Sequence, residues 1–204
     1  ATKDLLVKLD HIADVEYTFT KPEWINPEEF MESYIEKHEN GWVNFKPVVT
    51  WSKGHNLAKQ NLKDLSGEII LHKGEPIHTI LFPKDALKQV LDNIVSNAIS
   101  HGFKDESRND YQLRFSWETD GIALKMCVEN NGLPIPADRS TSSLLEYGVS
   151  TSLNSNGHHG IGCNEIDGIM RKYDGKIELV SSPDDEFRVK YILTFNRTNI
   201  LKTL

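Results

Sequence analysis

The chain has 204 residues, of which 38% are hydrophobic and 26% are charged, a composition typical of a folded globular protein. Its 23 Lys and Arg against 30 Asp and Glu give a formal net charge of −7, which argues against nucleic acid as a partner. No apolar run approaches the roughly 18 residues of a membrane helix, so we expect no membrane contact by this segment. Two cysteines without a CxxC motif favour a reducing compartment, and we expect a cytoplasmic location.

The amino-terminal part predicts two helices separated by a break. Apolar residues recur at helical spacing over Leu5–Val15, which predicts a short amphipathic helix. Thr20–Pro22 ends it, and Asn26 followed by Pro27 and two acids is typical of a helix start, with Phe30, Tyr34 and Ile35 as its apolar residues. The stretch 39–66 has no clear period and receives no assignment.

The next segment changes from strand to helix patterning. Glu68–His72 and Ile77–Phe82 flank Lys73–Pro76, which predicts a β-hairpin. A long amphipathic helix is predicted over Lys84–His101, because its apolar residues fall on one stripe. These residues are Leu87, Val90, Leu91, Ile94, Val95 and Ala98.

The carboxyl-terminal half predicts antiparallel strands and one more helix. Tyr111–Glu118 and Ile122–Glu129 alternate around a turn and predict a strand pair. The loop over Asn130–His159 is rich in Gly, Pro, Ser, Thr and Asn, and a loop of this length is usually functional. After it the pattern predicts a helix from Gly162 to about Tyr173, and then a final strand pair, Lys176–Ser181 with Phe187–Phe195. This order predicts an α+β fold with two layers, in which helices cover a mixed, mainly antiparallel sheet.

Three polar residues form a column on the long helix. Asn93, Asn97 and His101 are spaced i, i+4, i+8 and therefore lie along one border of the apolar stripe. Asn is a poor residue for a helix interior, so two of them one turn apart are costly without a packing return. Taken alone, the column is more often a solvated helix edge than a site.

Two further features follow the predicted strand Ile122–Glu129, and the second of them is glycine-rich. Asn130–Pro136 follows a predicted strand directly and serves equally well as an ordinary turn. Gly148–Ser152 and Gly157–Cys163 precede a helix, and glycines there let backbone amides approach an anion. Neither tract is a P-loop, because no Gly-Lys-Ser/Thr follows.

Together these features resemble the GHKL ATP-binding family, and within it the catalytic domain of sensor histidine kinases. Leu87–His101 is similar to that family's N box, Asn130–Pro136 to its G1 box, Gly148–Ser152 to its lid and Gly157–Cys163 to its G2 box. The resemblance covers about residues 76–195 and implies the two-layer Bergerat fold. Residues 1–20 are similar to the end of a dimerisation helix, which makes 21–204 the expected ATP-binding domain.

The resemblance implies ATP and Mg²⁺ as cofactors. Asn97 matches the family's Mg²⁺ ligand, a neutral oxygen donor. Asn93 stands where hydrolysing relatives carry a water-activating Glu, and an amide has no useful basicity, which favours phosphotransfer over hydrolysis. The residues implied to contact the nucleotide are Asn93, Asn97, His101, Asn130, Gly132, Ile135, Gly148, Ser150, Thr151, Gly157, Gly160, Ile161 and Gly162.

Three positions depart from the family pattern. Asn130 replaces the Asp that reads adenine, so the charge-assisted part of that hydrogen bond is lost. Pro134 replaces a glycine and removes an amide donor, and Ser100 replaces a phosphate-binding Lys. These departures predict a weak nucleotide affinity. His158 and His159 are interpreted as solvent-exposed lid residues.

The resemblance implies a two-component signal-transduction kinase. The domain would transfer the γ-phosphoryl of ATP to a histidine on an adjacent dimerisation domain, with a response regulator as the next partner and a homodimer as the full-length state. His11 is interpreted as a helix-surface residue rather than the acceptor, since Pro22 and Pro27 follow too soon for a long helical hairpin. A non-catalytic nucleotide-binding module and an anti-sigma-type protein-serine kinase remain alternatives, and a membrane-anchored parent protein is compatible with the pattern.

Overall fold

The computed structural model describes residues 18–38, 48–56, 78–105, 107–108, 110–119, 123–145, 161–196 and 200–202. The predicted helix Leu5–Val15 lies outside these ranges. Within them no helix is long and apolar enough to cross a membrane.

The main layer is a five-stranded sheet with the strand order β2-β4-β5-β7-β6. Its strands are β2 (Val48–Asn56), β4 (Gln112–Thr119), β5 (Leu124–Asn130), β6 (Gly175–Ser181) and β7 (Val189–Phe195). β2 pairs in parallel with β4, whereas the other three pairs are antiparallel. The predicted mixed, mainly antiparallel sheet is therefore confirmed, and both predicted carboxyl-terminal strand pairs form.

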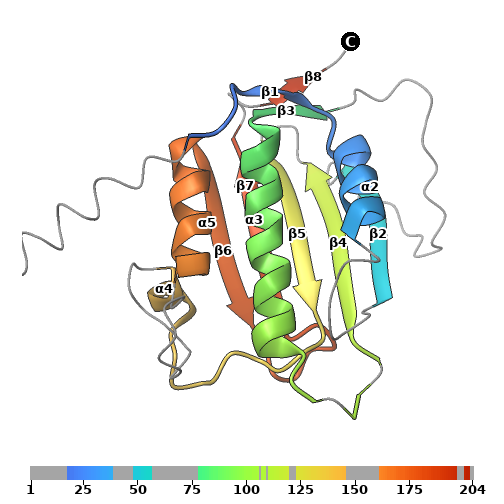
Figure 1. Cartoon of the computed structure of the whole chain (residues 1–204), viewed down its shortest axis with the longest axis vertical. Coiled ribbons are helices and arrows are strands. Elements are labelled where there is room, and N and C mark those ends of the chain that lie inside the picture. The colour runs from blue at the N-terminus through green and yellow to red at the C-terminus, as the bar shows by residue number, and fades with distance from the viewer. Residues whose placement is uncertain are drawn as a thin grey trace, which may run out of the picture.

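A small second sheet joins distant parts of the chain. It consists of β1 (Glu23–Ile25), β3 (His78–Phe82) and β8 (Ile200–Lys202), with β3 in the middle and both pairs antiparallel. Figure 1 shows this sheet at one end of the domain, beside the start of α3. The strand predicted over Ile77–Phe82 thus forms as β3, but it pairs with β1 and β8. The other half of the predicted hairpin, Glu68–His72, lies outside the described residues.

Three helices cover one face of the large sheet (Figure 1). They are α2 (Pro27–His38), α3 (Lys84–Asn97) and α5 (Ile161–Lys172), and a short α4 (Thr141–Leu144) lies in the long loop. Asn26 caps α2 as predicted, since its Oδ1 accepts a hydrogen bond from the Glu28 amide at 3.0 Å. This arrangement is the predicted two-layer α+β sandwich.

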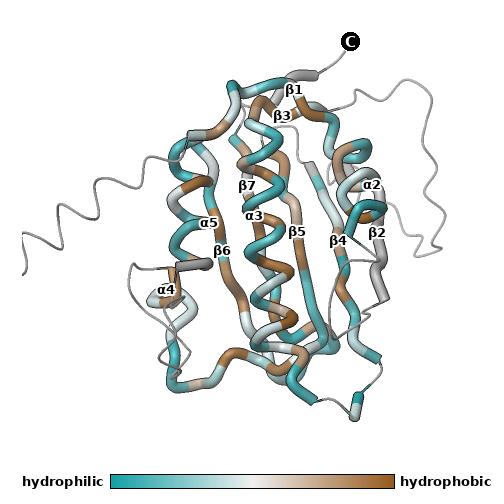
Figure 2. Tube along the Cα trace, in the orientation of Figure 1, coloured by the Kyte–Doolittle hydropathy of each residue, from teal (hydrophilic) through white to brown (hydrophobic). Residues whose placement is uncertain are grey.

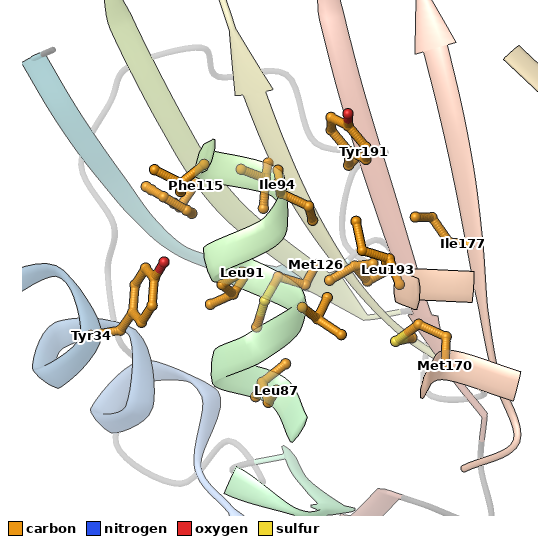
Figure 3. Packing of buried hydrophobic residues seen from close by; sticks show 14 of the residues in the cluster. Tyr34, Leu87, Leu91, Ile94, Phe115, Met126, Met170, Ile177, Tyr191 and Leu193 are labelled. Atoms are coloured by element: carbon orange, nitrogen blue, oxygen red, sulfur yellow. The ribbon is translucent and has the colours of Figure 1, made fainter. Parts of the chain in front are cut away.

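The core lies between α3 and the sheet. All six residues of the apolar stripe on α3 are buried, and residues such as Leu87, Leu91 and Ile94 pack against Phe115 and Met126 of β4 and β5 (Figure 3). Figure 2 shows apolar and polar residues alternating along α3, as expected for a helix with one face on a sheet. The stripe therefore fixes α3 rotationally, and with it the direction of the polar residues on its border.

Two ends of α3 differ in their local structure. At its start the hydrogen bonding is α-helical, and the Leu87 amide donates to the Pro83 carbonyl at 3.0 Å. At its end the α-helical hydrogen bonding changes to a π-turn over Ala98–Gly102. Such turns insert one extra residue into a helix and are frequent at functional sites. The end of β5 and the start of α5 lie beside this end of α3 (Figure 1).

Candidate nucleotide-binding site

The two asparagines of the polar column on α3 face α5 rather than open solvent. Asn93 Nδ2 donates to Glu165 Oε2 at 2.8 Å, and Asn97 Nδ2 lies 3.5 Å from the sulfur of Cys163. Both asparagines are half-buried. The two contacts join α3 to the first turns of α5, one helical turn apart. The asparagines therefore have partners inside the protein, which a solvent-exposed helix edge would not give them.

Glu165 is a member of this site that the sequence did not single out. Its Oε1 accepts a hydrogen bond from Gln89 Nε2, one turn before Asn93 on α3. Both oxygens of the carboxylate are therefore occupied by amide donors of α3. This fixes Asn93 and the amino-terminal turns of α5 relative to each other.

Cys163 links its contact with Asn97 to the large sheet. Its sulfur lies 3.9 Å from the hydroxyl of Tyr191, a buried residue of β7. Burial raises the pKa of the Cys163 thiol, and the hydrogen bonds from Tyr191 and Asn97 act in the opposite direction. Burial also raises the pKa of Tyr191 well above its usual value. Both groups are therefore neutral near pH 7.

The G1-like segment packs directly on the π-turn. A Cβ built on Gly132 would stand 2.7 Å from the carbonyl carbon of Gly102, closer than real Cβ atoms come to backbone. The amide of Leu133 also donates to the Gly102 carbonyl at 2.9 Å. Gly132 therefore allows close contact between two segments of this chain, where the sequence suggested only approach to a ligand.

Asn130 ends β5 inside this contact. Its Oδ1 accepts a hydrogen bond from the Gly132 amide at 3.1 Å, and its side chain is buried. The next residue, Asn131, has a structural role: its Oδ1 accepts from the Gln112 amide and its Nδ2 donates to the Asp110 carbonyl, both at 2.8 Å. Only the first asparagine of the Asn-Asn pair is thus turned toward the π-turn.

Positive charge gathers around His101. Partial burial of the ring lowers its pKa, and the nearby cations Lys104 and Arg139 lower it further. Lys104 follows the π-turn, whereas Arg139 comes from the loop before α4. Ser100 provides no cation, but these two residues place positive charge at the same end of α3, a feature that the sequence analysis missed.

A separate pocket of about 460 Å³ lies at the opposite end of α3. It is lined by residues of α2 and of the first turns of α3, among them Tyr34, Lys84 and Lys88. None of the predicted site residues lines it. The pocket therefore does not belong to the candidate site.

Comparison with known proteins places the chain in a family. A family model described as "Histidine kinase-, DNA gyrase B-, and HSP90-like ATPase" matches residues 83–197, which is more than half of the chain. The chain belongs to this ATPase family. No curated protein sequence matches it significantly.

Solved structures with a similar fold include catalytic domains of histidine kinases. The nucleotide-free catalytic domain of histidine kinase ThkA superposes with a TM-score of 0.60 at 17% identity, covering 87% of this chain and 97% of that one. The ATP-binding domain of PrrB from Mycobacterium tuberculosis gives a TM-score of 0.56 at 11% identity, covering 87% and 98%. Full-length ShkA with AMPPNP gives 0.61 at 13% identity, but this chain covers only 36% of it. At these identities the similarity establishes the fold.

The predicted site residues of this ATPase domain fall into three groups. Asn93, Asn97, His101, Asn130 and Gly132 gather where α3 and β5 end. Ile135 lies further along, where its amide donates to Ser181 Oγ at 2.9 Å, and the backbone of Ile161 and Gly162 opens α5. The lid and G2 residues Gly148, Ser150, Thr151, Gly157 and Gly160 lie outside the described residues.

The chemistry of Asn97 fits a magnesium ion. Its Nδ2 is directed at Cys163, so the carboxamide oxygen is the atom left for a hard cation. The described part of the chain contains no group of three or more His, Cys, Asp or Glu side chains that would hold a metal.

Proposed function

We propose that this ATPase-family domain is the catalytic domain of a two-component sensor histidine kinase. Residues 21–204 would form the domain that binds Mg·ATP, and residues 1–20 would lead in from a dimerisation domain. The observation that carries the proposal is that Asn97, which contacts the first turn of α5, lies at the same end of α3 as His101 and the Asn130–Gly132 turn. In this arrangement a helix amino terminus and an amide oxygen meet, which suits a metal-bound triphosphate.

Different residues would contact the metal ion, the phosphates and the base. Asn97 would hold Mg²⁺, which neutralises phosphate charge when bound. The amino-terminal turn of α5, together with Lys104 and Arg139, would balance the remaining negative charge of the phosphates. Asn130 would read the base. Catalysis would then consist mainly of positioning and charge stabilisation, as is general for phosphoryl transfer.

The arrangement around Asn93 favours transfer over hydrolysis. Asn93 itself cannot accept a proton from water, and the nearby carboxylate of Glu165 has both oxygens occupied by amide donors. The nucleophile would instead be the imidazole of a histidine on the adjacent dimerisation domain of a homodimer, and the phosphoryl group would pass on to a response regulator. The parent protein would act in the cytoplasm, either free or anchored to a membrane.

Calorimetric titration with Mg·ATP is the first test. We expect saturable binding by the 204-residue chain and loss of binding in Asn97→Ala, with Asn196→Ala as a control far from the site. The absence of binding at millimolar ATP in the parent chain would contradict the proposal.

The acceptor chemistry needs a second experiment. The full-length protein is incubated with ATP labelled at the γ-phosphate, and the labelled residue is tested for stability. Phosphohistidine is lost in acid, whereas phosphoserine survives, so an acid-stable product would support the protein-serine kinase alternative instead. Release of free phosphate without protein labelling would indicate a hydrolase.

A further inference from the structure

The oxygen of the Asn130 carboxamide is held by the backbone of this chain. Its Oδ1 accepts the hydrogen bond of the Gly132 amide at 3.1 Å, and a Cβ on Gly102 would stand 3.1 Å from the same oxygen. A backbone N–H can only donate, so the atom that faces Gly132 must be the oxygen rather than the nitrogen. Because the two ends of a carboxamide diverge, Nδ2 points away from Gly132.

The neighbouring strands offer no second polar group to the base. In the sheet, Asn130 pairs with Leu113 of β4 on one side and with Val189 of β7 on the other. Directly paired residues project from the same face, and both of these are apolar and buried. Hydrogen-bond discrimination at this position of the sheet therefore falls on Asn130.

These contacts reverse the hydrogen-bonding sense of the position. A carboxylate at position 130 would accept the Gly132 amide with one oxygen and keep a second acceptor for a ligand. Asn130 instead keeps a donor, Nδ2. The amino group at C6 of adenine is also a donor, so the two would oppose each other, whereas a carbonyl at C6 accepts from Nδ2. Rotating the carboxamide does not help, because Nδ2 would then oppose the Gly132 amide.

We propose that the site binds 6-oxopurine nucleoside triphosphates, such as ITP and GTP, at least as tightly as ATP. The inference rests on the proposed function, in that Asn130 reads the base of a bound nucleotide. It extends that function by naming the substituent that the site prefers. ITP is the sharper probe, because hypoxanthine differs from adenine only at C6 and the adjoining N1, and lacks the 2-amino group of guanine.

The test measures dissociation constants of Mg·ATP, Mg·ITP and Mg·tripolyphosphate for the 204-residue chain and for Asn130→Asp. We expect the parent to bind ITP with an affinity equal to or higher than that for ATP. In Asn130→Asp the ratio of ATP to ITP affinity should rise by about tenfold, the usual effect of exchanging a matched for an opposed hydrogen bond. The added negative charge acts on both nucleotides alike and cancels in this ratio.

The outcomes separate the inference from the function beneath it. A parent chain that clearly prefers ATP, or an Asn130→Asp variant with an unchanged ratio, overturns the base preference while nucleotide binding stands. Equal affinities for both nucleotides and tripolyphosphate show that no base is read, which also overturns it. If none of the three ligands binds, the proposed function fails and the inference fails with it.

Discussion

Gly132 and Gly102 touch through their backbones, which joins the turn after β5 to the π-turn after α3. The contact leaves no room for a Cβ on Gly132, and a hydrogen bond from the Leu133 amide to the Gly102 carbonyl at 2.9 Å closes it. Two segments about 30 positions apart in the sequence thus form one rigid unit. Asn130 and His101 belong to that unit, so their relative position depends on the glycine.

Gly132→Ala should lower the free energy of unfolding. The added methyl group meets backbone atoms, which cannot rotate away, and overpacking of this kind costs about 1–3 kcal/mol. Urea denaturation followed by circular dichroism measures the loss. Gly168→Ala is the control: it lies on an exposed position of α5, where alanine is preferred to glycine by about 1 kcal/mol and should stabilise the domain. Equal stability of Gly132→Ala and the parent would show that the contact relaxes freely.

Glu165→Ala should also destabilise the domain. It removes the acceptor of Gln89 and Asn93 and leaves two partly buried amide donors without a partner, at a cost of about 1–3 kcal/mol. Asp167→Ala removes a carboxylate from the same helix. Its ion pair with the exposed Arg171 is worth less than about 1 kcal/mol, so it serves as the matched control.

A double-mutant cycle measures the contribution of the Asn93–Glu165 contact alone. The variants Asn93→Ala, Glu165→Ala and their combination should show a coupling energy of about 0.5–3 kcal/mol in urea denaturation. Additive effects would mean that the 2.8 Å contact contributes nothing to stability.

Lys104→Ala and Arg139→Ala should each weaken Mg·ATP binding. Both cations lie near His101, and an exposed charge contact contributes about 0.2–1 kcal/mol, so we expect a decrease in affinity of roughly 1.5- to 5-fold. The decrease should shrink as salt is added, because salt screens exposed charges. Lys176→Ala, on an exposed position of β6, should leave the affinity unchanged. A loss that is independent of salt would point to an indirect effect on the fold.

Stability should fall as the pH drops through the range in which histidine titrates. The pKa of His101 is lowered in the folded state, so the unfolded chain binds its proton first. The contribution is fully present above the unfolded pKa of about 6.5 and is lost as the pH falls from there to the folded pKa. His101→Gln should therefore show a flatter stability curve between about pH 6.5 and 5 than the parent. A curve of identical slope would assign the effect to other groups.

The sequence predicted where the parts of the candidate site that lie on regular elements would be placed. The stripe on α3 fixed the rotation of the helix, and the column containing Asn93 and Asn97 followed from it. The role of Glu165 was not predicted, because an acid near a helix start is usually a solvent-exposed, favourable charge. Its partners on α3 also lie more than 70 positions away in the sequence. The position of Arg139 was not predicted either, because only the folded loop brings it near His101.

Irregular backbone and long-range strand pairing were also not predicted from the sequence. The pattern predicted a helix through His101, but the composition of Ala98–Gly102 did not indicate a π-turn. Similarly, β2 lies in a stretch without a clear period, and its parallel pairing with β4 is a long-range contact that alternation alone does not predict. The sequence thus anticipated the two layers but not the small sheet of β1, β3 and β8.

The small sheet and Thr20 together tie the incoming chain to one end of α3. Thr20 donates to both carboxylate oxygens of Asp85, at 2.9 Å from its amide and 2.8 Å from its hydroxyl, and β1 pairs with the strand that runs into the helix. α3 is a rod about 21 Å long, and Asn97 lies at its far end. A twist or pull applied to the chain before Thr20 would therefore act on one end of a helix whose other end carries Asn97, the residue proposed to bind Mg²⁺.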